Sequence, residues 1–409
     1  MKSRRNFIKN SALLGLGLFS NPWQTARASP LFTDKGKISI TAVDVVYFEN
    51  AHWTWIRLHT DSGFTGLGET YPFTRSQVGA LRDLVEVLIG KDPRDIEGIW
   101  KSLYTRAAFN VTGGAEMRII SAIDIALWDL LGKYYEAPVY RLLGGKAREN
   151  IRVYNTTNGI GDWTNEKDIE KIAEFLLDRG ICAMKIWPFD TVARKNTGSY
   201  ISPAEIESKL DWIRRIRNTV GKEMEIALEF HAYWNLPSAQ RIAAALEPYG
   251  IMWIEDIMFP ENVEAYAKLC GETSIPVCIS ERLATRFPFA RLLQEKACDI
   301  AMFDVTWCGG LTSGKKIADL ADTFMVPSAP HTYGGPVLWY ASMHLAIALT
   351  NLWIMESGYY FYHDIYPDFL EEVIIPENGV VQPPEEPGLG IKLREGLLDD
   401  PDTVIEKII

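Results

Sequence analysis

Cysteine, basic charge and long apolar runs are all scarce in this chain. Five cysteines among 409 residues, none of them in a CxxC pair, are too few for a disulfide framework. Cys182, Cys278 and Cys298 lie in or beside apolar runs, so we expect buried free thiols there. A net charge of −11 argues against nucleic acid or anionic lipid as a partner, because both need a basic face. Hydrophobic residues at 47% and charged residues at 23% are instead typical of a globular protein with a large core.

The first 28 residues have the features of an export signal. Ser3-Arg4-Arg5-Asn6-Phe7-Ile8-Lys9 resembles the twin-arginine pattern S-R-R-x-F-L-K, and Ala26-Arg27-Ala28 supplies a small-x-small cleavage site. The apolar run between them, residues 12–19, is far shorter than the roughly 20 residues of a membrane-spanning helix. We therefore predict a twin-arginine signal peptide over residues 1–28, the twin-arginine export machinery as a partner, a periplasmic mature protein and no stable membrane anchor. The alternative is an ordinary basic N-terminus.

Residues 38–150 show strand patterns followed by helix patterns. Segments rich in β-formers cover 38–50 and 52–59, and Gly66-Leu67-Gly68-Glu69 ends a further strand, which together predict an antiparallel meander. Helical stretches follow at 76–88, 95–109 and 115–134, and the last has the three- and four-residue apolar spacing of a packed helix. Strands followed by helices predict an α+β domain.

From residue 151 onward, short apolar strands alternate with helices, which predicts a parallel β/α barrel over residues 151–369. A doubly wound open sheet is the competing fold, but residues 155–159 lack its glycine-rich phosphate turn. The tail after residue 369 is rich in proline and acid, and we expect loops that pack back on the first domain. The eight expected strands are 151–156, 181–187, 224–230, 251–255, 277–280, 299–303, 326–330 and 352–355.

Polar side chains stand at the C-terminal ends of these strands. The carboxylates and the histidine that follow one another from residue 229 to residue 356 are 23 to 27 residues apart, which is one βα unit each time. Strand ends meet at one mouth of a barrel, so we expect one shared site. Three neighbouring carboxylates would repel each other without a cation, and oxygen ligands without clustered cysteine indicate Mg²⁺ or Mn²⁺ rather than zinc. The set comprises Lys185, Glu229, His231, Glu255, Glu281, Asp304, His331 and Glu356.

Several motifs resemble the enolase superfamily, in its mandelate racemase and muconate lactonizing branch. The stretch 122–129, Ala-Ile-Asp-Ile-Ala-Leu-Trp-Asp, and the Leu-Leu-Gly-Gly of 142–145 resemble the helix and linker of that superfamily. The carboxylate series, Asp304 before Gly309-Gly310, and Ala329-Pro330-His331 match the branch as well. The resemblance covers residues 38–409. It implies an α/β fold: a (β/α)7β TIM-like barrel, 151–369, with an α+β capping domain, 38–150, completed by the tail 370–409.

The same resemblance implies a role for each site residue. His331, oriented and kept basic by Asp304, would remove the proton α to a carboxylate. Glu356 would be protonated and would hydrogen-bond the substrate carboxylate, which Lys185 would also stabilise. A bound Mg²⁺ would grip that carboxylate and stabilise the enediolate. The implied metal ligands are Glu229, Glu255 and Glu281.

Two positions depart from the family pattern. Racemases of this branch carry Lys-x-Lys at the end of the second barrel strand, whereas this chain has Lys185-Ile186-Trp187. Tryptophan cannot accept a proton, which argues against racemisation by two opposed bases. The first metal ligand is Glu229 where aspartate is commoner, and the extra methylene would shift the metal or change its coordination.

His231 turns the prediction toward dehydration. Glu229-Phe230-His231 resembles the Asp-x-His of galactonate and mannonate dehydratases, whose histidine protonates the departing β-hydroxyl, and Glu281-Arg282-Leu283 resembles the galactonate dehydratase group. Side chains two apart on a strand share a face, so His231 reaches the site if Glu229 does. The simpler alternative is a histidine that satisfies a loop carbonyl. The sequence thus predicts a Mg²⁺-dependent sugar-acid dehydratase, a carbon–oxygen lyase that gives a 2-keto-3-deoxy acid.

Other functions remain open at this point. An epimerase or a cycloisomerase could use the same enediolate, and a periplasmic sugar-acid binding protein could descend from such an enzyme. Substrate choice belongs to the capping domain, whose loops near 49–53 and 71–75 we expect to close the mouth. Family members are commonly homo-oligomers, so we expect one here.

Overall fold

The computed structural model describes residues 36–49, 51–72, 75–107 and 113–409. The predicted signal peptide, residues 1–28, lies outside these ranges. Within the described residues, no helix combines the length and the apolar character needed to cross a bilayer. All five cysteines are free thiols; Cys278 and Cys298 are buried as expected, whereas Cys182 is exposed.

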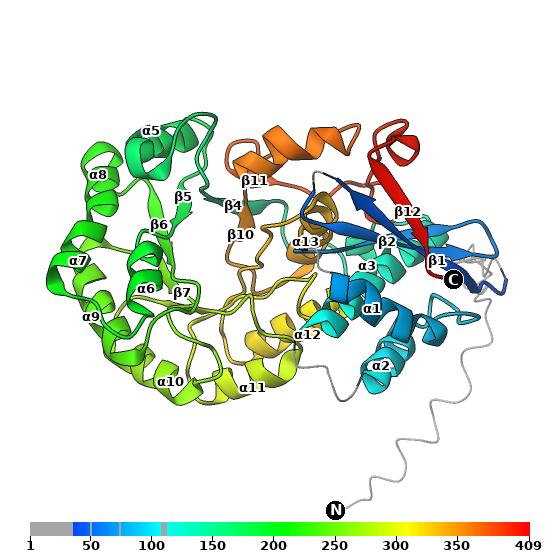
Figure 1. Cartoon of the computed structure of the whole chain (residues 1–409), viewed down its shortest axis with the longest axis horizontal. Helices are drawn as coiled ribbons and strands as arrows, with labels where there is room; N and C mark the ends of the chain where they lie inside the picture. The colour runs from blue at the N-terminus through cyan, green and yellow to red at the C-terminus, as the bar shows by residue number, and fades with distance from the viewer. Residues whose placement is uncertain (1–35, 50, 73–74, 108–112) are drawn as a thin grey trace, which may run out of the picture. The chain divides into compact units, whose positions relative to one another are not determined.

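The capping domain contains a four-stranded antiparallel sheet (Figure 1). The predicted meander is present as β1 (Ile40–Phe48), β2 (Thr54–Thr60) and β3 (Thr65–Thr70). A fourth strand, β12 (Thr403–Lys407), pairs with β1 from the far end of the chain, so that the sheet order is β12-β1-β2-β3. The expectation of a tail made only of loops is therefore wrong.

Helix α3 (Ala115–Tyr135) packs on this sheet, beside α1 (Arg75–Leu84) and α2 (Ile96–Arg106). The contact with β3 is close because glycine stands where a side chain would collide. A Cβ at Gly68 would lie 1.9 Å from the Ala122 carbonyl oxygen, and one at Gly66 would lie 2.2 Å from that of Ala126. The glycines of the predicted strand end thus allow the helix to approach the backbone of the sheet.

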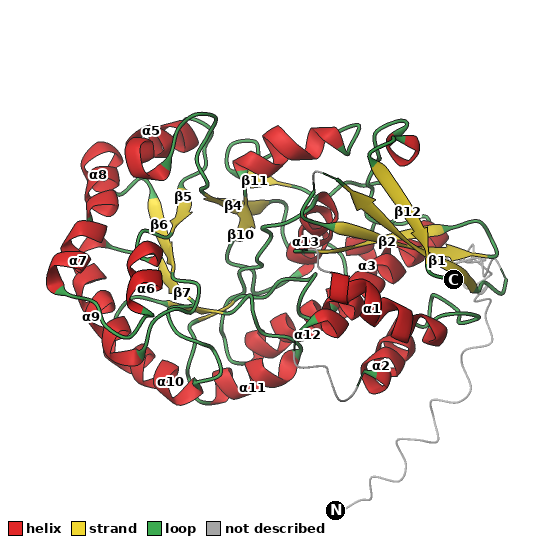
Figure 2. Ribbon diagram, viewed as in Figure 1, coloured by secondary structure: helices red, strands yellow, loops and turns green. Residues whose placement is uncertain are grey.

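The second part of the chain contains a curled sheet of parallel strands in the order β10-β4-β5-β6-β7-β8-β9 (Figure 2). Between β9 and β10 the barrel is closed by Ser328, which bridges Ala301 on one side and Leu352 on the other. The predicted strand 326–330 is thus reduced to isolated bridges. Strand 151–156 is present with the predicted ends, and the other predicted strands are present with shifted ends. The barrel strands are β4 (Ile151–Thr156), β5 (Ala183–Ile186), β6 (Glu225–Glu229), β7 (Trp253–Glu255), β8 (Val277–Ile279), β9 (Ile300–Ala301) and β10 (Met355–Ser357).

Helices lie around the outside of the strands (Figure 2), and a small apolar cluster fills the interior. Tyr154 and Trp253 meet there edge to face, with ring centroids 5.1 Å apart. The barrel is therefore a packed core with its polar groups at one mouth. The helices are α5 (Asn165–Leu177), α6 (Asp190–Asn196), α7 (Pro203–Lys209), α8 (Asp211–Val220), α9 (Leu236–Leu246), α10 (Val263–Glu272), α11 (Arg286–Gln294), α12 (Gly310–Thr323) and α13 (Pro336–Ala348).

Buried acids of α3 join the sheet domain to the barrel and the tail. Asp124 Oδ2 accepts a hydrogen bond of 2.9 Å from the Thr312 backbone N–H in the first turn of α12, where a negative charge is favoured. Asp129 accepts one from Leu67 of β3 and one from Leu389 of the tail, each 2.9 Å long. The tail also touches the barrel directly, since β11 (Val380–Val381) pairs antiparallel with β4.

Candidate active site

A cavity of about 360 Å³ opens at the C-terminal ends of the barrel strands. The capping domain contributes Tyr71 and Pro72 to its wall, as predicted for the 71–75 loop; residues 73–74 lie outside the described ranges. Trp53 of the other predicted loop is buried against Tyr366 and Phe369 instead. The barrel contributes Thr156, Asn158, Lys185, Trp187, Arg194, Glu229, His231, Glu281, Trp307, His331, Tyr333 and Glu356.

Lys185 lies among three carboxylates at the base of this cavity. Its Nζ is 2.6 Å from Glu255 Oε1, 3.0 Å from Glu356 Oε1 and 3.7 Å from Glu229 Oε2. Burial alone would lower the pKa of Lys185, but the charges of Glu255 and Glu356 outweigh it and hold the pKa well above its ordinary value. The ammonium is therefore a permanent positive charge at the end of β5.

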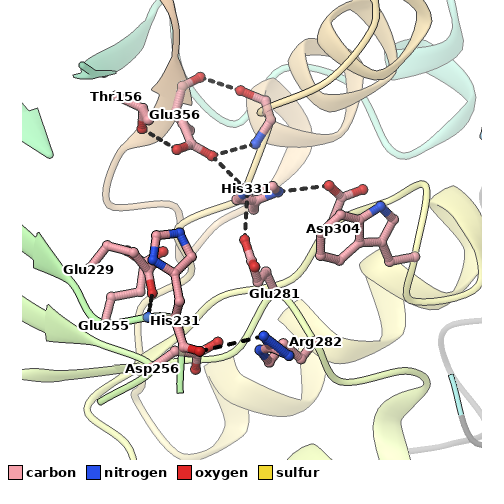
Figure 3. Close-up of polar contacts among 12 residues, drawn as sticks. Thr156, Glu229, His231, Glu255, Asp256, Glu281, Arg282, Asp304, His331 and Glu356 are labelled. Carbon is pink, nitrogen blue, oxygen red and sulfur yellow. Dashed lines mark hydrogen bonds and ion pairs between the residues drawn. The ribbon is translucent and has the colours of Figure 1, made fainter. Parts of the chain in front are cut away.

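His331 and Asp304 form a buried pair, as the sequence predicts (Figure 3). His331 Nδ1 lies 2.7 Å from Asp304 Oδ2, and its Nε2 lies 2.7 Å from Glu281 Oε2. The other oxygen of Asp304 accepts hydrogen bonds of 2.6 Å from both the N–H and the hydroxyl of Thr306, which fixes the carboxylate. Burial would lower the pKa of His331, but Glu356, Glu281 and Asp304 together raise it well above its usual range.

Glu356 lies beside Lys185 and His331. The Thr156 hydroxyl donates to Oε1, and the Thr332 N–H donates to Oε2 at 2.8 Å. Burial raises the pKa of Glu356, but Lys185 and His331 reverse that effect, so the pKa is lower than that of an ordinary glutamate. Lys185 and His331 thus favour the carboxylate form here, and the protonated Glu356 expected against a substrate carboxylate stays a prediction.

His231 reaches the cavity, but not by the alternation of a strand. Strand β6 ends at Glu229, and His231 has a left-handed backbone with φ of 49°. Its backbone N–H donates a hydrogen bond of 2.5 Å to Glu229 Oε1, so the His231 backbone and the Glu229 carboxylate fix each other's position. The His231 ring lies edge to face with the Trp187 ring, with 6.0 Å between the ring centroids. Trp187 is the residue that stands where racemases of the family carry the second lysine.

Several residues of the site were not found from the sequence. The Tyr71 carbonyl accepts hydrogen bonds from Arg118 and from Trp307 Nε1, the latter 2.6 Å long. The Arg118 guanidinium lies 4.1 Å from the centre of the Trp307 ring, and that ring lies 5.3 Å from the His331 ring. Arg118 is the one charged residue in the apolar stretch 117–123. A charge in such a stretch could have marked Arg118 as a candidate site residue.

Glu69, a buried carboxyl group, was also missed. It accepts hydrogen bonds from Trp55 Nε1 at 3.0 Å and from the backbone N–H groups of Val337 and Leu338, in the first turn of α13, at 3.1 and 3.2 Å. Burial raises the pKa of Glu69 to about 8 in spite of these donors. The residue connects β3 of the capping domain to the helix that follows His331.

The carboxylates predicted to bind a metal suit Mg²⁺ in chemistry. Glu229 and Glu255 end adjacent strands, and Glu281 follows the next strand. Burial and the neighbouring carboxylates raise the pKa of Glu229 to about 7 and that of Glu255 well above its usual value, whereas His331 lowers the pKa of Glu281 to about 2 in spite of burial. In the described part of the chain, no three acidic, histidine or cysteine side chains are gathered to hold a metal ion. Lys185 and His331 balance these charges here.

Comparison with known proteins places this geometry in a family. Residues 34–144 match the model of the mandelate racemase / muconate lactonizing enzyme N-terminal domain, and residues 168–397 match that of the enolase C-terminal domain-like family. The chain belongs to the mandelate racemase / muconate lactonizing enzyme family. Its predicted resemblance and its TIM-barrel fold with a capping domain are thereby confirmed.

Relatives within this family include dehydratases. The chain is 32% identical to D-galactonate dehydratase of Ralstonia nicotianae over 85% of this chain and 90% of that one. It is 31% identical to D-galactonate dehydratase of Pectobacterium atrosepticum, with the same coverage. A crystal structure of an enolase of the mandelate racemase subgroup from Agrobacterium tumefaciens superposes with a TM-score of 0.84 at 35% identity, over 90% of this chain and 98% of that one. The prediction of an enzyme of the dehydratase type is confirmed by these relatives.

Proposed function

We propose that this family member is a Mg²⁺-dependent dehydratase of a sugar acid, which it converts to a 2-keto-3-deoxy acid. One observation carries the proposal: His331, which is paired with buried Asp304, and a second histidine, His231, line the same cavity. His331 follows the isolated bridges of Ser328, and His231 follows β6. A β-elimination of water needs one group to take the α-proton and another to protonate the leaving hydroxyl. The galactonate dehydratases among the relatives support this class of substrate.

The cavity suits an anionic, hydroxylated substrate. Lys185 and Arg194 supply positive charge to its wall, and Asn158, Tyr333 and Thr156 supply hydrogen-bonding groups. Lys185 is the natural partner for the substrate carboxylate because its Nζ already lies 3.0 Å from a carboxylate oxygen of Glu356. Glu356 closes the same end of the cavity and would orient the substrate through a shared proton.

The reaction divides between the two histidines. His331 Nε2 takes the α-proton, and Asp304 holds the ring through Nδ1, so that the new positive charge forms beside a carboxylate. The electron pair of the broken C–H bond forms the Cα–Cβ double bond as the β C–O bond breaks. His231 gives its proton to the departing hydroxyl, which leaves as water. The enol product becomes the 2-keto-3-deoxy acid as its hydroxyl proton is lost to solvent and the β-carbon takes up a proton.

Glu229, Glu255 and Glu281 are the residues that would hold Mg²⁺. When bound, the ion supplies positive charge that offsets the negative charge developing on the substrate carboxylate. His331 Nε2 faces Glu281 Oε2 at 2.7 Å, so this nitrogen would have to be free of that contact to accept the α-proton. Trp187 supports dehydration over two-base epimerisation because no second base stands at its position.

The place of action and the assembly are part of the same proposal. Residues 3–9 and 26–28 support twin-arginine export to the periplasm, and they lie outside the described residues. A homo-oligomer is proposed from the resemblance alone.

A screen of sugar acids tests the proposed function. The mature protein with Mg²⁺ is incubated with a library of monoacid and diacid sugars, and 2-keto acid is measured. We expect turnover of at least one member, lost on adding a chelator and restored by Mg²⁺. Binding of a sugar acid without any 2-keto acid, and without exchange of the α-proton in D₂O, would instead support a binding protein.

A further inference from the structure

Arg194 lies apart from the other charged groups of the active-site cavity. It belongs to α6, and its side chain is 65% exposed, whereas the side chain of Lys185 on the preceding strand β5 is 3% exposed. Of the lysine and arginine side chains among the described lining residues, Lys185 lies within 4 Å of three glutamates of the barrel strands, and Arg194 lies within 4 Å of none of them. The cavity thus has a permanent positive charge at its buried base and another at its exposed edge.

Arg194 forms an ion pair within its own helix. Its Nη2 donates to Oδ2 of Asp190, one turn earlier, at 3.4 Å. The guanidinium carbon lies 5.5 Å from the centre of the Tyr233 ring. A pair of this length on an exposed side chain contributes little, and a guanidinium has five N–H donors in a planar fork. Arg194 therefore has donors left for a ligand in the cavity.

The position of Asp190 places Arg194 near the proposed leaving group. Asp190 Oδ2 lies 3.4 Å from Arg194 Nη2 and 2.8 Å from His231 Nδ1, so the guanidinium and the His231 ring are on the same side of the cavity. In the proposed reaction His231 faces the β-carbon, while Lys185 and Glu356 hold the carboxylate on the other side of the α-carbon. Arg194 then lies beyond the β-carbon, where the rest of the sugar chain extends.

We propose that Arg194 is a specificity-determining residue that pairs with a second anionic group, at the end of the sugar acid remote from the reacting carboxylate. The anionic group is a terminal carboxylate or a phosphate ester, because both present two oxygens to the planar fork of a guanidinium. A hydroxymethyl group, the end of a simple aldonic acid, would offer Arg194 only a neutral partner. The inference deepens the proposed function and rests on it for the direction in which the substrate lies.

Selectivity among matched acids tests this assignment. Three six-carbon acids of one configuration, the one that the screen identifies, are compared with Mg²⁺ present: the aldonic acid, the aldaric acid with a carboxylate at C6, and the aldonic acid 6-phosphate. They differ only at the remote end. We expect kcat/KM of the better dianionic acid to exceed that of the aldonic acid by about 10-fold or more, because a charge-assisted pair replaces a neutral contact. The acid with the higher value identifies the terminal group as a carboxylate or a phosphate.

Substitution of Arg194 should change this selectivity. In Arg194→Met the ratio of kcat/KM, dianionic acid over aldonic acid, should fall by about 10–100-fold. The ratio is the readout because a general effect of the change, such as one that passes through Asp190 to His231, acts on all three acids alike. Arg194→Lys keeps the charge without the planar fork, so its ratio should lie between those of the parent and Arg194→Met. Arg291→Met, at an exposed arginine of α11 that pairs with Glu264, is the matched control and should keep the parent ratio.

Two kinetic results would overturn the proposal. The first is a parent protein that turns over the aldonic acid as well as, or better than, both dianionic acids. The second is an unchanged ratio in Arg194→Met, which would show that the preference arises elsewhere in the cavity.

Calorimetric binding separates this proposal from the proposed function. The probes are D-galactonate, galactarate and D-galactonate 6-phosphate, each with Mg²⁺ present. If no sugar acid is turned over but a dianionic probe binds the parent at least about 10-fold more tightly than D-galactonate, and Arg194→Met loses that margin, the proposed function fails and the pairing with Arg194 stands. Turnover without any preference for a dianionic acid gives the reverse result. Neither turnover nor a binding preference would refute both.

Discussion

Lys185 Nζ lies 2.6 Å from Glu255 Oε1, with both side chains almost entirely buried. This one ammonium also lies within 4 Å of Glu229 and Glu356, so it compensates carboxylates on three other strands. Lys185 thus compensates the negative charge at the mouth of the barrel. It lies on β5, which pairs with β6, the strand that carries the proposed metal ligand Glu229.

Lys185→Met tests that arrangement through stability. Removing one partner of a buried ion pair leaves charges uncompensated, so we expect the free energy of unfolding to fall by about 3–5 kcal/mol with a chelator present. Mg²⁺ should recover more stability in Lys185→Met than in the parent, since it would supply the missing positive charge. Denaturant unfolding with and without Mg²⁺ measures both effects. Equal stability of the two proteins in chelator would show that Lys185 does not compensate these carboxylates.

Glu255→Gln tests the metal proposal. The change removes a full charge from a proposed ligand while keeping its shape, so activity should fall by more than about 10³-fold and the Mg²⁺ content should fall with it. The fold should persist, as judged by circular dichroism. Glu264→Gln, at an exposed glutamate that pairs with Arg291, is the matched control and should keep both activity and metal. Full turnover by metal-free parent protein would refute the ligand assignment.

His344 predicts a pH dependence of stability. Its Nδ1 accepts from the Tyr140 N–H at 3.3 Å and its Nε2 faces the Leu389 carbonyl at 3.1 Å, so the folded protein holds the neutral ring with the proton on Nε2. Burial lowers the pKa of His344 to about 4. Between about pH 6.5 and 4 the unfolded chain binds a proton that the folded chain refuses, and stability falls as the pH drops through this window.

His344→Gln can make both hydrogen bonds without titrating, so it should remove that part of the pH dependence. The loss of stability between pH 6.5 and 4 should be smaller in His344→Gln than in the parent by up to about 3 kcal/mol. His363→Gln, at an exposed histidine, should leave the pH dependence unchanged. Parallel pH profiles of parent and His344→Gln, from urea unfolding, would contradict the neutral buried ring.

Export provides a test outside the barrel. Replacing Arg4 and Arg5 together by lysine should retain the precursor in the cytoplasm, because the paired arginines are the feature that resembles a twin-arginine signal. Fractionation of expressing cells measures the distribution of the protein. Undiminished export of the double variant would leave a general secretory signal as the better interpretation.

The barrel was predictable from sequence because its strands are apolar runs repeated at a βα spacing. Strand β12 was not predictable in this way, since its pairing partner β1 lies at the other end of the chain and the five residues Thr403–Lys407 follow an acidic, proline-rich stretch. Pairing between strands so far apart in the chain depends on the tertiary fold, and the local sequence pattern of residues 403–407 does not indicate it.

The site shows the same limit at the level of single side chains. Types and spacing brought Glu229, Glu281, His331 and Glu356 to one cavity correctly, because strand ends of a barrel converge. The closeness of Lys185 and His331 to Glu356 was not predictable, because sequence spacing does not give distances of a few ångströms between side chains.

The most direct test of the two-histidine mechanism compares turnover with α-proton exchange in His331→Asn and His231→Asn. With a substrate found by the screen, His331→Asn should lose both, since nothing removes the α-proton. His231→Asn should lose turnover by about 10²–10⁴-fold and retain exchange with D₂O, since His331 still acts and its proton can leave to solvent. Full turnover in His231→Asn, or exchange that persists in His331→Asn, would contradict the account; the second result would place the base on the opposite face, where Lys185 stands.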